Sequence, residues 1–104
     1  MRELDLTPLE IHTVRHGLVV LKAVPALSLE PGMDETRQLL CVEHSGLALD
    51  VFAPTREALP TELNEQIAML WAEYALADDN ELDAVARQLK QALLATFTEV
   101  RDAA

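Results

Sequence analysis

The feature that most constrains the fold is a change in residue usage near Pro54. Residues before it are rich in β-branched side chains, short apolar runs and turn formers, which are typical of strands joined by tight turns. Residues after it are rich in alanine, leucine, glutamate and glutamine, which favour helices. The sequence therefore predicts an α+β fold, with an N-terminal antiparallel β-hairpin or small meander packed against a C-terminal helical hairpin. A length of 104 residues fits a single domain over 1–104, mainly β over 9–53 and a helical hairpin over 61–102.

Residues 37–53 carry the clearest strand pattern. Two apolar segments flank Ser45-Gly46, and a two-residue loop at that point pairs His44 with Leu47, Val42 with Leu49, and Leu40 with Val51. Because side chains alternate between the two faces of a strand, this register gathers one set of apolar residues on one face. That set is Leu40, Val42, Leu47, Leu49 and Val51, and the other face receives Leu39, Cys41, Glu43, Asp50 and Phe52.

Residues 8–16 fit two patterns. Thr7-Pro8-Leu9-Glu10 resembles a helical capping box with proline at the first helical position, and apolar residues follow at helical spacing. The strand alternative rests on the strand-like composition and on Gly17, which would cost about 1 kcal/mol inside a helix. The sequence leaves helix and strand open for 8–16.

The strand alternative for 8–16 implies a hairpin with the residues that follow. A three-residue turn at Arg15-His16-Gly17 would place Ile11 opposite Leu21. We predict a strand over 18–24 and a loop over 25–36, because the latter contains two prolines and a glycine.

Two apolar stripes predict the helices after Pro54. Thr61 is the expected N-cap of the first helix. Its apolar stripe recurs at about 100° per residue and consists of Leu63, Ile67, Leu70, Trp71 and Tyr74. We expect core packing for Trp71 and Tyr74. Asp78-Asp79-Asn80 interrupts the pattern and can cap the second helix, whose apolar stripe runs from Leu82 to Val100.

Composition excludes several classes of protein. A formal net charge of −10 argues against nucleic acid as a partner, because phosphate binding needs a basic surface. One cysteine cannot form an internal disulfide, which favours a reducing, cytoplasmic location. No apolar run is long enough to span a bilayer, so we expect no membrane association. Glycine-rich phosphate loops and nucleophile-elbow motifs are absent from the sequence, and we therefore expect no cofactor and no enzymatic activity.

A small set of histidines and the cysteine provides the main alternative. Imidazole and thiolate are common metal ligands, and two of the histidines are four residues apart. On this alternative the protein is a metal- or small-ligand-binding domain built on His12, His16, Cys41 and His44. A hairpin over 37–53 weakens it, because Cys41 and His44 would then point to opposite faces of their strand.

The distribution of charge along the C-terminal half is more informative. Residues 57–83 contain eight acidic side chains and no lysine or arginine. On a helical projection, acids and a few apolar residues share the outer face of the first helix. The outer face of the second helix carries Leu94 beside three basic residues, Arg87, Lys90 and Arg101. These two faces predict an interaction surface made of Glu62, Glu65, Met69, Glu73, Leu76, Arg87, Lys90 and Leu94.

Faces of opposite charge favour contact with a protein partner, or with a second copy of the chain in a symmetric dimer. The sequence therefore predicts a small acidic, non-enzymatic protein-interaction module that uses a polarised helical hairpin. An adaptor, a secretion or assembly chaperone, and an inhibitor or immunity-type protein all belong to this class.

Overall fold

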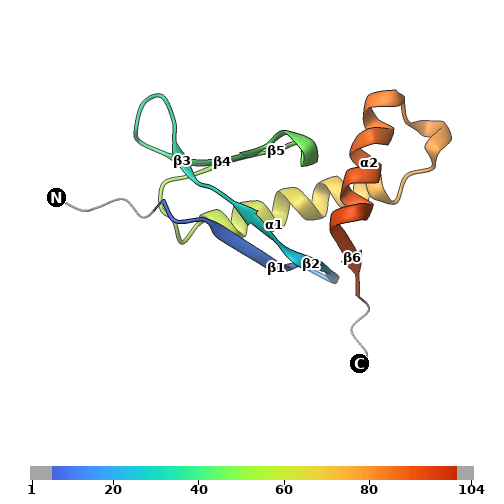
Figure 1. Cartoon of the computed structure of the whole chain (residues 1–104), viewed down its shortest axis with the longest axis horizontal. Coiled ribbons are helices and arrows are strands. Elements are labelled where there is room, and N and C mark those ends of the chain that lie inside the picture. The colour runs from blue at the N-terminus through green and yellow to red at the C-terminus, as the bar shows by residue number, and fades with distance from the viewer. Residues whose placement is uncertain (1–5, 101–104) are drawn as a thin grey trace.

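Two small antiparallel sheets and two main helices make up the fold in the computed structural model, which describes residues 6–100 (Figure 1). One sheet has the strand order β1-β2-β6, and the other has the order β3-β4-β5. The α+β prediction is confirmed, with strands first and helices later. The elements are β1 (Leu9–His16), β2 (Val19–Leu29), β3 (Gly32–Met33), β4 (Leu40–His44), β5 (Leu49–Ala53), α1 (Leu59–Leu70), α2 (Ala84–Thr96) and β6 (Phe97–Glu99).

The first hairpin resolves the ambiguity over residues 8–16 in favour of a strand. His16 pairs with Val19, so the turn holds only Gly17 and Leu18. Gly17 has a φ of 59°, which suits the first central position of a type II′ turn and matches the twist of the flanking strands. The expected three-residue turn is therefore wrong, because glycine takes a central turn position rather than the last one.

A β-bulge in this hairpin lengthens β2 beyond the predicted strand. Thr13 pairs with Lys22, but Ile11 pairs with Leu27, so extra residues of β2 lie between the two pairs. Pro25 lies in this extra segment, where its missing N–H removes no ladder hydrogen bond. The predicted loop over 25–36 is consequently wrong where β2 continues to Leu29 and where β3 forms.

The β4–β5 hairpin has the predicted faces but a different register. Val42 pairs with Val51 rather than with Leu49, because a 3-10 turn over Ser45–Leu47 and a left-handed Ala48 replace the two-residue loop. The His44 Nδ1 accepts a hydrogen bond from the Leu47 N–H at 3.1 Å and stabilises that turn. A shift of two residues keeps every side chain on its face, so the predicted apolar face is buried. Its buried members are Leu40, Val42, Leu47, Leu49 and Val51.

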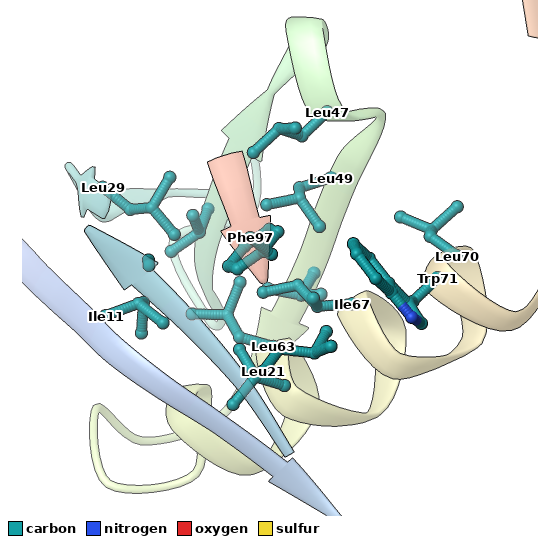
Figure 2. Packing of buried hydrophobic residues seen from close by; sticks show 14 of the residues in the cluster. Ile11, Leu21, Leu29, Leu47, Leu49, Leu63, Ile67, Leu70, Trp71 and Phe97 are labelled. Carbon is teal, nitrogen blue, oxygen red and sulfur yellow. The ribbon is translucent and has the colours of Figure 1, made fainter. Parts of the chain in front are cut away.

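Helix α1 forms the centre of the core. It lies between β5 and β1 in Figure 1 and packs against both. Leu63 and Ile67 point from α1 into an apolar cluster that both sheets share (Figure 2). The helix begins at Leu59 with Pro60 in its first turn, so the prediction of Thr61 as the N-cap is wrong. Proline suits this position, since first-turn N–H groups have no intrahelical acceptor.

The end of α1 buries the aromatic residues as predicted. A π-helical turn over Trp71–Ala75 continues the helix, and Trp71 is 4% exposed. Tyr74 is half-buried and packs against the core cluster. The Trp71 Nε1 is buried and has no hydrogen-bond acceptor among residues 6–100.

Helix α2 is shorter than predicted. It begins after Asp83, whose carboxylate accepts a hydrogen bond from the Ala86 N–H at 2.8 Å, so Asp78-Asp79-Asn80 does not supply the cap. The chain leaves the helix at Phe97 and forms β6, whereas the apolar spacing predicted a helix to Val100. Pairing with the edge of β2 gives the backbone of 97–99 partners on one side and still buries Phe97. The last two residues of the predicted range 61–102 lie outside the described residues.

Neighbouring leucines on α2 provide a test of this packing. Leu93 is fully buried, whereas Leu94 is 45% exposed. Leu93→Ala should lower the free energy of unfolding by about 2–5 kcal/mol, because it removes buried methyl groups and leaves a cavity. Leu94→Ala should cost less than about 1 kcal/mol. Urea denaturation followed by circular dichroism measures both, and equal losses would contradict the described orientation of α2.

Candidate interaction surface

The outward face of α1 carries the predicted acidic and apolar side chains. Glu62, Glu65 and Glu73 are exposed there, as the helical projection predicts. Met69 and Leu76 are 50% and 61% exposed on the same stretch. These five residues lie on α1 and on the π-helical turn and cap residue that continue it, and we call them the acidic face of α1. Their exposure follows from helical geometry, because the buried stripe occupies the opposite side of the helix.

A groove of about 410 Å³ separates the acidic face of α1 from β5. It combines three carboxylates with two large apolar side chains, Phe52 and Met69, of which Phe52 is 44% exposed. Like-charged groups and exposed apolar surface thus occur in one concave site. Its lining residues are Asp50, Val51, Phe52, Glu62, Glu65, Gln66 and Met69.

Gln66 connects α1 to β5 inside this groove. Its Oε1 accepts a hydrogen bond from the Asp50 N–H at 2.8 Å, and its Nε2 donates to the Asp50 carbonyl at 3.3 Å. A side-chain amide has the same donor and acceptor as a peptide group. Gln66 therefore takes the place of one residue of a neighbouring strand on the edge of β5.

The contribution of β5 to the groove was missed by the sequence prediction. The alternation over 37–53 places Asp50 and Phe52 together on the outer face of their strand. This pattern could have indicated both residues as part of an exposed surface. The proximity of that strand to α1 depends on tertiary packing. Gln66 gave no signal, because a glutamine beside the buried stripe of a helix is an ordinary solvated residue.

Of the two predicted basic residues on α2, Arg87 is exposed as expected, whereas Lys90 is oriented differently from the prediction. The Lys90 side chain is only 16% exposed, and its Nζ lies 2.9 Å from the Asp79 Oδ1 and 2.6 Å from the Ala77 carbonyl oxygen. The Arg87 Nε donates to the Asp79 carbonyl at 2.9 Å. The predicted outer-face position of Lys90 is therefore wrong, because the segment between the helices offers it acceptors. Leu94 is exposed on α2 as expected, and its predicted basic neighbour Arg101 lies outside the described residues.

The hydrogen bond from Lys90 and its charge, together with the charge of Arg87, lower the pKa of the Asp79 carboxyl group. These contacts bind the start of α2 to the connecting segment. They also pair the Lys90 ammonium group within the chain, so it is not presented on the outer face of α2.

Substitution of Lys90 tests this internal role. Lys90→Met should lower the free energy of unfolding by about 1–3 kcal/mol at neutral pH, because it removes hydrogen bonds made by a charged donor. The Asp79 pKa is depressed on folding, so its contribution is present above the ordinary value of 3.8 and is lost as pH falls through the lowered folded value. The stability difference between the wild type and Asp79→Asn should therefore shrink below pH 3.8 in urea titrations. A pH-independent difference would contradict the pairing.

The histidines and the cysteine do not form a metal centre in the described part of the chain. His12 and His16 are exposed on β1, where the His12 Nε2 lies 3.6 Å from the Glu10 Oε2. His44 supports the turn after β4, and Cys41 is half-buried on the same strand. Over residues 6–100, no group of three or more histidine, cysteine, aspartate or glutamate side chains is placed to hold a metal ion.

The environment of Cys41 also opposes a nucleophilic role. Burial and the nearby Glu43 carboxylate raise the pKa of its thiol. A raised pKa disfavours the reactive thiolate.

A second groove, of about 530 Å³, lies between the turn after β4 and the start of α2. Tyr74, Val85 and Leu89 supply its apolar surface, and Asp83 its acidic group. The Asp83 carboxylate already caps α2. This groove therefore offers fewer uncommitted polar groups than the one beside β5.

Comparisons with protein-family models, with curated proteins and with solved structures give no match to this chain. Within residues 6–100, the helices are too short or too polar to cross a membrane.

Proposed function

We propose that this protein is a non-enzymatic interaction module that binds a basic, partly apolar segment of a partner protein. The binding site is the groove between β5 and the acidic face of α1. The observation that carries this proposal is the joining of Asp50, Glu62 and Glu65 with exposed Phe52 and Met69 in one groove.

The two kinds of side chain have different roles in such a contact. Carboxylates attract a basic partner over distances of about a Debye length and select against acidic ones. Phe52 and Met69 supply apolar area, which contributes about 25 cal/mol for each Å² removed from water. Methionine adapts its shape to different partners, and aromatic residues are enriched at contact centres.

The contacts of Lys90 within the chain favour a different protein, rather than a second copy of this chain, as the partner. A symmetric dimer between oppositely charged faces requires several exposed basic groups on α2. Lys90 is bound to the connecting segment instead. Arg87 is exposed, but its Nε already donates to the Asp79 carbonyl of the same segment. We therefore propose a heterologous partner that brings its own lysines or arginines.

Adaptors, secretion or assembly chaperones, and inhibitors or immunity-type proteins all use contacts of this kind, and the proposal covers them as one class.

We also propose a cytoplasmic location. The free thiol of Cys41 supports it, because disulfides predominate in oxidising compartments.

Two basic peptides test the proposal, one alternating lysine and valine and one with lysine and leucine at helical spacing. At least one should bind the wild-type protein in low salt and weaken as salt is added, measured by isothermal titration calorimetry. Glu62→Lys with Glu65→Lys should reduce that affinity by at least about tenfold, because attraction becomes repulsion.

Glu30→Lys with Glu35→Lys is the matched control. It changes the net charge equally at two exposed residues that do not line the groove. Its effect should be about twofold or less. Equal losses of affinity in the two double variants would show a response to net charge alone. The proposal would be overturned if neither of the two peptides bound. Light scattering of the unliganded protein distinguishes a monomer, as proposed, from a self-associating chain.

A further inference from the structure

The outer edge of β5 is unpaired in the described structure. Strand β5 is the last member of the order β3-β4-β5, and no strand of residues 6–100 lies on its other side. An exposed edge presents a row of N–H and C=O groups that can pair with another chain. The groove beside α1 therefore has a backbone edge as one of its walls.

The direction of the edge groups follows from Asp50. Its N–H and C=O both bind Gln66 on α1, so they point away from β4. Backbone groups alternate in direction along an antiparallel strand, so those of Phe52 also point outward, while those of Val51 pair with Val42 on β4. Among residues 6–100, the outward N–H and C=O of Phe52 have no strand partner, so Phe52 offers one donor and one acceptor at the groove.

We infer that the partner segment binds in extended form, as a fourth strand added to the outer edge of β5. This inference rests on the proposed function and specifies how the basic segment is held. Main-chain hydrogen bonds to Phe52, and to Asp50 once Gln66 moves aside, supply the pairing. Strand addition of this kind gives affinity through the backbone and specificity through alternate side chains.

The side chains around the edge indicate the composition of that strand. An added strand directs alternate residues to opposite faces of the sheet. Asp50 and Phe52 line one side, whereas Glu62, Glu65 and Met69 of α1 line the other. Each side offers negative charge and apolar surface, so the fitting segment carries basic and apolar residues and few acids.

The other outer edges suit such a segment less well. Strands β3 and β6 have only two and three residues. The outer face of β1 carries both an acid, Glu10, and a base, Arg15, so it does not select for positive charge. The edge of β5 is the one that borders the acidic groove.

The alternating lysine–valine peptide, about eight residues long, tests the strand directly. It should bind more tightly than the helical peptide, and binding should slow exchange of the Phe52 amide hydrogen at least about tenfold in NMR spectra. The Val51 amide is the internal control, because it already points to β4 and should change little. A copy of the peptide N-methylated at its four central residues keeps the charges but loses those donors, and its affinity should fall at least about tenfold.

Substitutions in the protein separate backbone from side chain. Phe52→Pro should bind the alternating peptide about fivefold more weakly than Phe52→Ala, because only proline removes the outward N–H. Gln66→Ala should bind it more tightly than the wild type, since the Asp50 edge groups are then uncovered. Circular dichroism shows whether each variant is folded, and the N-methylated peptide tests the inference in the wild-type protein.

The outcomes distinguish this inference from the proposed function. Unchanged binding of the N-methylated peptide, or an unprotected Phe52 amide at saturation, overturns strand addition but leaves the acidic binding surface in place. If the helical peptide binds more tightly than the alternating one, strand addition is likewise overturned and the acidic binding surface stays in place. Failure of both unmodified peptides to bind overturns strand addition and the proposed function together.

Discussion

Burial of one face of α1 between the two sheets is the interaction on which the structure depends. Each sheet has only three strands and one apolar face to cover. Leu59, Leu63 and Ile67 are fully buried in a cluster that includes residues of both sheets. Because β3 has two residues and β6 three, each sheet is little more than a two-stranded hairpin. A hairpin alone is marginally stable and gains stability from packing against a helix. We therefore expect both sheets to depend on α1 to remain folded.

The same packing determines what the protein exposes. A helix that buries one stripe presents the opposite side to solvent, and on α1 that side carries acids with Met69 between them. Contact of α1 with β5 also places the helix beside an unpaired strand edge. Gln66 covers part of that edge, which is one way proteins limit unwanted strand pairing. The proposed binding site is thus a consequence of the packing of α1 against β5.

Local patterns were sufficient to predict the faces of the elements. Alternation predicted that Val42 and Val51 are buried, and helical spacing predicted the same for Ile67 and Trp71. These assignments tolerate errors in turns, since a register shift of two residues leaves every side chain on its face. Helical spacing also predicted that Glu62 and Glu65 face outward, because they lie opposite the apolar stripe of α1.

Features that depend on distant partners could not be predicted. Phe97 continues the apolar spacing of α2, but the open edge of β2 draws residues 97–99 into a strand. Lys90 lies where a projection predicts solvent, but the Ala77 carbonyl and the Asp79 carboxylate lie within its reach. The bulge opposite Ile11 depends on the path of β2 through Pro25. For the candidate site, the sequence indicated the α1 half and missed the β5 half.

The groove between β5 and the acidic face of α1 is the proposed binding site for a basic segment. Backbone amide shifts in NMR spectra, followed during titration with the alternating lysine–valine peptide, locate the bound segment on the protein. The largest saturable shifts should fall on residues 50–52 of β5 and 62–69 of α1. Small, non-saturating shifts spread over acidic residues on all sides of the molecule would rule out this binding site.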